Sequence, residues 1–223
     1  NHDRLLELAE FDRPSVTPRD IGFVIGPRLN AAGRLSDASL GVKLLLSSTT
    51  DEAMGIAKQL EVLNQDRRQI DADILTESLS LAKDDSSLKN SHVTVLSNKG
   101  WHAGVIGITA SKMVDRLEKP AVIVAEDGDL ARGSARSVGS VNIYKVLKEC
   151  SSYFTTFGGH KEAAGFSMPA SNVDAFKTAL VGVSNTMITE QELRPIMKID
   201  CVLSPTQLTQ TLDISQSYSN SIL

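Results

Sequence analysis

Hydrophobic and polar positions follow a helical repeat over the first 84 residues of the chain. Residues 1–12 predict a short amphipathic helix, and residues 39–47 predict a second, more apolar one. Glu52 lies three positions after Thr49, as in a capping box, and apolar residues then recur about every 3.5 positions. We therefore expect one helix of about 30 residues over 49–84, on the order of 45 Å long, a length typical of helices that span between domains.

The pattern changes to alternating strands and helices after residue 90. Short runs rich in Val, Ile and Ala indicate strands, and polar or glycine-containing turns separate them. The predicted strands are 92–97, 121–125, 130–137 and 164–169, and the predicted helices are 104–118, 141–153 and 171–185. A strand, a helix and a strand within about 30 residues indicate an α/β unit, so the fold class is α/β. A strand-like run at 197–203, a short helix from 204 and a loosely held end after 215 follow.

Two consecutive glycines precede a histidine in residues 157–166, Phe-Gly-Gly-His-Lys-Glu-Ala-Ala-Gly-Phe. Gly158 and Gly159 let a backbone approach a ligand closely, and we expect a turn with the imidazole of His160 at its tip. The common structural alternative is a turn followed by a capping or core histidine. The segment therefore predicts a site for a polar ligand only in combination with other groups.

Such a group precedes it in Gly-Ser-Ala-Arg-Ser, residues 133–137. Ser134, Arg136 and Ser137 supply two hydroxyls and a guanidinium fork, a combination that suits phosphate oxygens better than a hydrophobic core.

Residues 22–35 combine three glycines, a proline, two arginines and an asparagine. This composition predicts a shaped loop that presents Arg28, Asn30 and Arg34. The alternative is a glycine-rich corner between two helices with arginines on its surface.

Composition restricts the function classes. With 223 residues and 41% apolar content, the chain is long enough to bury a core and to form one or two domains. The net charge of -4 means that a nucleic-acid contact has to come from a local basic patch. Cys150 and Cys201 lack the spacing of a metal site, which favours free thiols in a reducing, cytoplasmic setting. We find neither an apolar run long enough to span a bilayer nor a signal peptide, and the first residue, Asn1 within a helical pattern, suggests a fragment.

Four motifs occur together in a fixed order. They are Ile-Gly-Pro-Arg-Leu-Asn-Ala-Ala-Gly-Arg-Leu at 25–35, Trp-His-Ala-Gly-Val-Ile-Gly-Ile-Thr-Ala at 101–110, and the segments at 133–137 and 157–166. In this order and spacing they resemble the RecJ family of single-strand-specific exonucleases, within the DHH phosphoesterase superfamily. The resemblance covers about residues 1–185 and, less clearly, the remainder.

This resemblance implies an α/β protein in which a DHHA1 domain, a mixed sheet flanked by helices, follows the end of a DHH domain and a long connecting helix. On this map residues 1–48 are the C-terminal part of the DHH domain and residues 49–84 are the connecting helix. Residues 90–187 are the substrate-binding DHHA1 domain, and residues 190–223 are the start of an OB-like domain or a tail.

The resemblance also implies two divalent metals, Mn²⁺ or Mg²⁺, held by an Asp-x-Asp motif, a further aspartate and an Asp-His-His motif. The sequence contains no adjacent pair of histidines. Its two Asp-x-Asp strings, at 71–73 and 127–129, are interpreted as solvated carboxylates on a helix and in a turn. We therefore expect the metal ligands upstream of Asn1 and none in this chain.

The function implied is that of the nucleic-acid-binding portion of a metal-dependent, 5′-to-3′ single-stranded-DNA exonuclease of DNA repair and recombination. By itself the chain would be inactive, with single-stranded DNA as its partner and no membrane contact. One alternative is an oligonucleotide or cyclic-dinucleotide phosphodiesterase of the same superfamily, and another is a noncatalytic DNA-binding scaffold. The long helix and residues 25–35 favour the exonuclease.

The resemblance and the chemistry together assign roles to particular residues. Ser134 and Arg136 would bind a phosphate or the 5′ end, and Arg34 would reach it from the DHH side. His160, beside the Gly158-Gly159 backbone, would face the metal cleft as the candidate catalytic group.

Several further residues have two interpretations. Trp101 and His102 could stack on or hydrogen-bond the strand, although a tryptophan before a helix is more often a core residue. Lys99, Arg132 and Lys161 are either backbone contacts or ordinary surface charges. The complete set of candidate substrate-binding residues is Arg28, Asn30, Arg34, Trp101, His102, Ser134, Arg136, Ser137, Gly158, Gly159 and His160.

Overall fold

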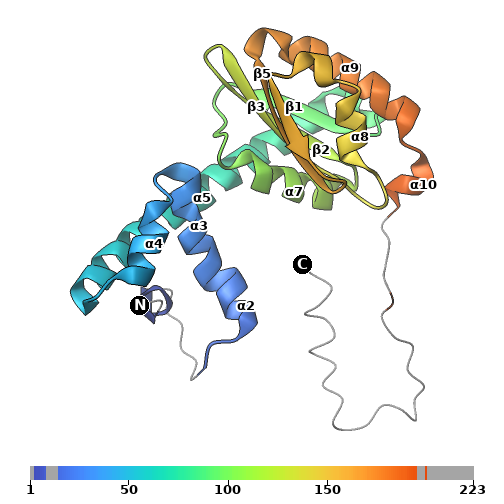
Figure 1. The fold of residues 1–223 in the computed structure, drawn as a ribbon. Coiled ribbons are helices and arrows are strands. Elements are labelled where there is room, and N and C mark those ends of the chain that lie inside the picture. Colours follow the sequence, from blue (N-terminus) through green and yellow to red (C-terminus); the bar gives the residue numbers. More distant parts are fainter. Residues whose placement is uncertain (1–2, 9–14, 195–198, 200–223) are drawn as a thin grey trace, which may run out of the picture.

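The computed structural model describes residues 3–8, 15–194 and 199 (Figure 1). The first part is helical and comprises α1 (Asp3–Leu8), α2 (Pro18–Asp20), the π-helical turn η1 (Ile21–Ile25), α3 (Gly26–Leu35), α4 (Ser39–Leu46), α5 (Thr50–Asp84) and α6 (Ser86–Lys89). The second part comprises β1 (Thr94–Asn98), α7 (Ile106–Leu117), β2 (Ala121–Asp127), β3 (Leu130–Arg136), α8 (Ile143–Lys148), η2 (Ser151–Tyr153), β4 (Thr156–Gly159), β5 (Ala163–Pro169), η3 (Ala170–Asn172), α9 (Val173–Met187) and α10 (Glu190–Leu193).

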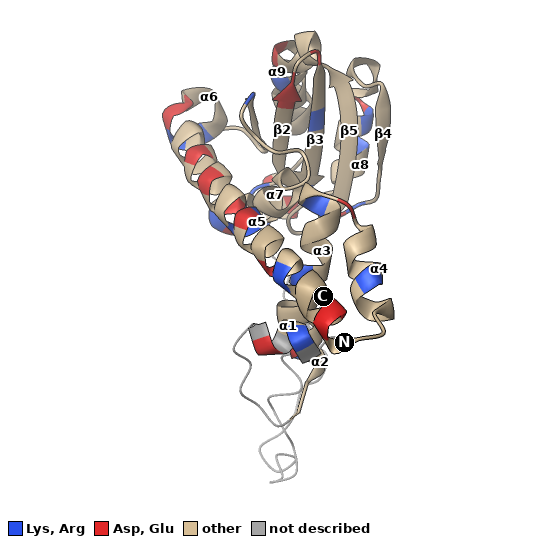
Figure 2. Cartoon of the chain, turned by 90° about the vertical axis from the view of Figure 1, so that its left-hand side faces the viewer, with Lys and Arg blue, Asp and Glu red and all other residues tan. Residues whose placement is uncertain are grey.

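The 35-residue helix α5 connects two hydrophobic cores (Figure 1). α1, α3 and α4 pack on its first half, where Leu60 lies in a small core with Leu5, Ile25 and Leu44. Its second half packs on α7 and β1, and Ile74 there belongs to the larger core of the sheet. Charged residues of both signs follow its exposed side (Figure 2). The long helix expected from the apolar repeat is therefore present, and it holds the helical part against the sheet.

The sheet has five strands in the order β1-β2-β3-β5-β4. β1 is parallel to β2, as the connection through α7 requires, and the other neighbours are antiparallel. α7 packs on β2 and β3 from one face, while α8 and α9 cover β5 and β1 from the other. The mixed α/β fold expected from the sequence is confirmed.

The face under α8 and α9 is aromatic. Phe166 of β5 stacks on Phe154 with ring centroids 4.4 Å apart, and Phe176 of α9 meets both rings edge-on. Phe157 of β4 stacks on Tyr144 of α8 at 4.8 Å. Because side chains alternate between the faces of a strand, this packing leaves the intervening residues of β3, β4 and β5 on the opposite face.

The prediction that residues 22–35 form a shaped loop is wrong, because η1 and α3 make the segment helical. Pro27 stands near the start of α3, directly after the π-helical turn η1. A methyl group on Gly33 would lie 3.4 Å from the Cβ atom of Ala38 in the turn toward α4. This is an ordinary van der Waals contact, so the glycines of the segment neither break the helix nor form a loop.

The prediction of a turn at residues 157–160 is wrong for residues 157–159, whereas His160 does lie in the turn of the hairpin. Phe157, Gly158 and Gly159 belong to β4, because Gly158 pairs with Gly165 and Gly159 with Ala164 of β5. His160 begins the connection to β5, and its backbone N–H donates to the carbonyl of Ala163 at 2.8 Å.

Other boundaries differ in smaller ways. The helix expected over 141–153 consists of α8 and the separate short turn η2. Apart from Ile199, the strand expected at 197–203, the helix after it and the tail lie outside the described residues. No helix in the described ranges combines the length and the apolarity that a membrane crossing needs.

Asp71 of α5 is buried, which corrects its interpretation as a solvated carboxylate. Only 2% of the residue is exposed. Its carboxylate accepts a hydrogen bond from the Thr109 hydroxyl at 3.0 Å and from the Lys112 ammonium at 2.6 Å, both on α7. Asp73, two positions along, is exposed as expected and accepts from Gln69. Asp71 therefore joins the long helix to the helix that covers the sheet.

We expect Asp71→Ala to lower the free energy of unfolding by about 2 kcal/mol, because it leaves the buried Thr109 hydroxyl without its acceptor. Lys112 is about half exposed and can turn to water, which limits the loss. The matched control Asp73→Ala should change stability by no more than about 0.5 kcal/mol. Urea unfolding of the three proteins measures both values, and equal effects would show that the bonds of Asp71 add nothing.

Candidate functional site

An open cleft of about 470 Å³ lies where the end of α3 meets the start of α7 and the uncovered face of the sheet. Its walls and floor come from five separate parts of the chain. The residues that line it are Arg34, Ala103, Gly104, Ile106, Gly107, Arg132, Gly133, Ser134, Arg136, Thr156, Phe157, Gly158, Gly165, Phe166 and Ser167.

Strand β3 supplies the polar side chains of the cleft. Arg132, Ser134 and Arg136 all line it, because alternate residues of a strand share one face. The Arg136 guanidinium donates to the Ser134 hydroxyl at 3.0 Å and to the Ala135 carbonyl at 2.8 Å. These bonds hold the guanidinium in place and leave other N–H groups for a ligand, since a guanidinium has five donors.

Arg34 enters the cleft from the last turn of α3. Its guanidinium donates to the carbonyl of Gly104 at 3.0 Å, a bond between residues 70 positions apart. Gly104 is also in close contact with the backbone of Arg34: a Cβ atom added to it would lie 3.0 Å from the Arg34 carbonyl carbon and nearer still to the oxygen. This contact fixes Arg34 opposite the sheet.

The arginines of the cleft carry uncompensated charge. None of the ion pairs within the described part of the chain involves Arg34, Arg132 or Arg136. Burial and the positive charge of Arg34 together lower the pKa of the Arg136 guanidinium, which still remains protonated at physiological pH. Two like charges that repel each other, and that form no ion pair with a described acidic residue, make a site for an anion.

Glycines form the floor of the cleft. Gly158 of β4 and Gly165 of β5 are paired residues, and neither is held by packing: a Cβ atom on Gly158 would meet nothing within 4 Å. Gly107 of α7 lies close to the polar groups. A Cβ atom added to it would lie 3.1 Å from Ser134 Oγ and 3.1 Å from Arg136 Nη2. A ligand can therefore approach the bare backbone of the sheet.

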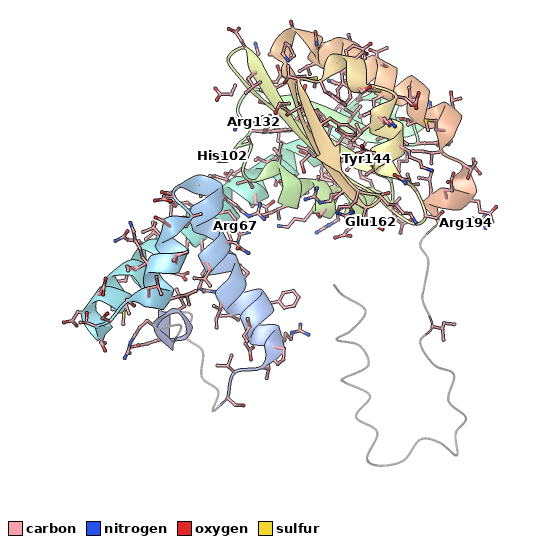
Figure 3. The ribbon with its side chains drawn as sticks, in the orientation of Figure 1. Arg67, His102, Arg132, Tyr144, Glu162 and Arg194 are labelled. Atoms are coloured by element: carbon pink, nitrogen blue, oxygen red, sulfur yellow. The ribbon has the colours of Figure 1, made fainter. Side chains whose placement is uncertain are left out.

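Four of the candidate residues chosen from the sequence line this one cleft: Arg34, Ser134, Arg136 and Gly158. His102 lies exposed on the loop beside this group, and its Nδ1 atom accepts from the N–H of Gly104 at 3.1 Å (Figure 3). The remaining nitrogen of His102 is free to donate toward solvent.

Three other candidates have structural partners instead. Trp101 is 6% exposed, and its indole N–H donates to Glu77 of α5 at 2.7 Å, so it is a core residue and not a stacking platform. Arg28 forms an ion pair with Glu61 at 2.5 Å. The Ser137 hydroxyl donates to the Val141 carbonyl at 2.8 Å. None of the three lines the cleft.

His160 lies in the connection between β4 and β5 and is not among the residues that line the cleft. The side chain is 69% exposed, and its Nδ1 atom lies 2.7 Å from a carboxylate oxygen of Glu162. This hydrogen bond lowers the pKa of Glu162. Gly159 before it has φ 151°, and a Cβ atom there would collide with the backbone of Ala163 and Ala164. Gly159 is therefore required by the hairpin itself.

A second, smaller hollow of about 180 Å³ lies on the other side of Arg34. Asn30 lines it together with Arg67 of α5, a residue at the junction of the helical part and the sheet (Figure 3). Burial is the main cause that lowers the pKa of Arg67, and its Nε atom has no partner within the described residues. Arg67 is not among the candidates chosen from the sequence, where the available signal is an arginine that interrupts the apolar repeat of residues 49–84.

Metal-binding chemistry is not assembled in the described part of the chain. There, no group of three or more His, Cys, Asp or Glu side chains is placed to hold an ion.

Residues 90–183 match the family model of the DHHA1 domain. The chain carries a DHHA1 domain. The DHHA1 domain thus contains β1 to β5 and every cleft residue except Arg34.

Curated relatives extend the similarity beyond the DHHA1 domain. The single-stranded-DNA-specific exonuclease RecJ of Bacillus subtilis is 32% identical over 207 residues, which are 92% of this chain and 26% of the relative. RecJ of Escherichia coli is 34% identical over 215 residues, 92% of this chain and 37% of the relative. The chain therefore spans about a quarter to over a third of the curated relatives that it matches.

Solved structures show the same similarity to RecJ. The crystal structure of RecJ from Thermus thermophilus in complex with Mn²⁺ superposes with a TM-score of 0.74 at 28% identity, over 91% of this chain and 29% of that one. A complex of the same protein with Mg²⁺ gives 0.74 at 27% identity, over 92% and 33%. The resemblance to RecJ inferred from the four motifs is confirmed for both the helical part and the DHHA1 domain.

Proposed function

We propose that this chain is the nucleic-acid-binding portion of a metal-dependent, 5′-to-3′ single-stranded-DNA exonuclease that acts in DNA repair and recombination. The observation that carries the proposal is the pair Arg34 and Arg136, which face one cleft from two different parts of the fold without an acidic partner among the described residues. The RecJ relatives are named for action on single-stranded DNA, which supports a strand of DNA as the ligand.

The division of the chain follows from the same proposal. We assign residues 1–48 to the end of a DHH domain, 49–84 to the connecting helix, 90–187 to the DHHA1 domain and 190–223 to an OB-like start or a tail. Arg34 then belongs to the DHH side and Arg136 to the DHHA1 side, so that the cleft is formed by both. The match of residues 90–183 to the DHHA1 model supports this division.

In this proposal the terminal phosphate of the strand lies between the two arginines. The Arg136 guanidinium and the Ser134 hydroxyl bind its oxygens from the sheet, and Arg34 binds from the end of α3. Gly158 and Gly165 keep side chains out of the space that the first nucleotide takes. Holding the strand in this way places the next phosphodiester bond for reaction, a positioning role in catalysis.

The RecJ structures hold Mn²⁺ or Mg²⁺, ions that activate water and stabilise charge on a phosphoryl group. The described residues of this chain do not fit such an ion. The role proposed for this chain is therefore substrate binding, with His160 as a candidate for the side toward the metals.

We expect Arg136→Ala to weaken the binding of 5′-phosphorylated single-stranded DNA by about 10- to 100-fold, since a charge-assisted hydrogen bond contributes roughly 1.5–3 kcal/mol. Fluorescence anisotropy at two salt concentrations measures the affinity and its salt dependence. Arg116→Ala, which removes an exposed arginine of α7 outside the cleft, is the matched control and should bind as the wild type does.

A manganese-dependent nuclease assay run alongside separates binding from cleavage, and no cleavage is expected. Equal affinities of Arg136→Ala and Arg116→Ala would contradict the proposed site. Cleavage by this chain would contradict a binding role alone. Tight binding of dinucleotides with no gain for longer DNA would favour the oligonucleotide or cyclic-dinucleotide phosphodiesterase.

A further inference from the structure

We propose that Arg132, Ser167 and Thr156 form a second phosphate subsite, which holds a phosphodiester further along the strand whose terminal phosphate lies between Arg34 and Arg136. This inference rests on the proposed function and extends the binding site from the end of the strand to its backbone.

The pairing register arranges the cleft face of the sheet in rows across β3, β5 and β4. Residues of one row are direct partners, and successive rows are two residues apart along each strand, so all of them share the face opposite the aromatic packing. The rows are Arg136–Ala163, Ser134–Gly165–Gly158 and Arg132–Ser167–Thr156.

The first and third rows are too far apart to serve one phosphate. Arg132 and Arg136 lie four residues apart in one strand, a separation of about 13 Å between their Cα atoms. The hydrogen bonds of the Arg136 guanidinium to Ser134 and to the Ala135 carbonyl hold it toward the middle row, so a phosphate bound by Arg136 and Ser134 lies over the first two rows and leaves the third row free. The row between them ends in two glycines, which leaves room for a nucleotide to pass from one row to the next.

The third row has the chemistry of a phosphate subsite. Arg132 is exposed and lines the cleft, and no hydrogen bond or ion pair engages its guanidinium within the described residues (Figure 3). Thr156 and Ser167, which pair with one another, add two hydroxyls to the same side. A guanidinium with neighbouring hydroxyls binds the phosphate backbone and reads no base, so the contact is independent of sequence.

The inference is tested with Arg132→Gln in the full chain, against Arg116→Gln as an exposed arginine outside the cleft. The probes are a fluorescent, 5′-phosphorylated thymidine decamer and unlabelled thymidine 5′-monophosphate as competitor. We expect Arg132→Gln to weaken decamer binding by about tenfold and to reduce the slope of log affinity against log salt by about 1. Competition by the monophosphate, which reaches only the first two rows, should be unchanged.

Three results would overturn the inference. Decamer affinity and salt slope equal to those of Arg116→Gln would remove Arg132 from the binding surface. An equal loss for decamer and monophosphate would place Arg132 at the terminal phosphate instead. A wild-type chain that binds no decamer would overturn the proposed function and this subsite with it. If Arg136→Ala lowers the affinity for the decamer and Arg132→Gln does not, the subsite alone is overturned.

Discussion

Gly104→Ala should weaken the binding of single-stranded DNA by about 10- to 100-fold while leaving the DHHA1 domain folded. The added methyl group would lie 3.0 Å from the carbonyl carbon and 3.2 Å from the Cα atom of Arg34, and closer to the carbonyl oxygen. Both sides of this contact are backbone, so no side-chain rotation relieves it. The end of α3 has to move away from the loop before α7, and Arg34 moves with it.

The loss in affinity should reach that of removing Arg34 altogether, about 10- to 100-fold. Two contacts between the same residues fail together, because the displacement also breaks the bond from the Arg34 guanidinium to the Gly104 carbonyl. The core of the sheet contains neither residue, so the far-ultraviolet circular dichroism and most of the stability should remain.

Gly100→Ala is the matched control for this change. It lies in the same loop, and its added methyl group would meet only Asn98 Oδ1, at an ordinary 3.5 Å. We expect this variant to bind DNA with wild-type affinity. If Gly104→Ala binds equally well, the placement of Arg34 does not depend on this backbone contact, and the cleft tolerates movement of α3.

The sheet side of the cleft could be predicted from the sequence because it depends on local periodicity. Ser134 and Arg136 are two residues apart in a strand, so their common face follows from alternation alone. The length of α5 likewise followed from its apolar repeat. The partner of this face, Arg34, was chosen through the family motif, and its approach to Gly104 across 70 positions is a tertiary contact that no local pattern encodes.

The errors concern residues whose type is typical of one environment but which the fold uses in another. Glycine and proline in 22–35 indicated a loop, whereas the segment is helical, with Pro27 near the start of α3 and the glycines inside the helical turns. Asp71 looked like one more charge on a solvated helix, and it became buried because Thr109 and Lys112 of α7 satisfy it. Trp101 looked available for stacking until Glu77 accepted its N–H in the core. For Asp71 and Trp101 the deciding partner lies on a different element.

Gly133→Ala should have the largest effect on stability, a loss of about 3 kcal/mol or more in the free energy of unfolding. Gly133 lies in β3 directly opposite Phe166, and its added Cβ atom would lie 2.6 Å from Cε1 of that ring and closer still to two further ring atoms. Phe166 is 4% exposed and is held by Phe154 and Phe176, so the ring cannot turn away without disturbing both. Thermal and urea unfolding measure the loss.

A neighbouring glycine provides the control, because it faces the other side of the sheet. A methyl group on Gly165 would meet only the Gly133 carbonyl oxygen at 3.7 Å, so Gly165→Ala should change stability by less than about 0.5 kcal/mol while reducing DNA binding in the cleft. The two variants therefore separate the aromatic face from the binding face.

A second substitution, at Phe166, tests why Gly133→Ala lowers stability. Phe166→Leu alone costs stability through lost aromatic packing, but it also removes the ring atoms that the alanine would strike. We therefore expect the double variant to be more stable than the sum of the single losses predicts, by at least about 1 kcal/mol in a double-mutant cycle. If the losses in the free energy of unfolding are additive, Gly133→Ala acts through the strand backbone. The proposal that the Phe166 ring requires glycine at position 133 would then be wrong.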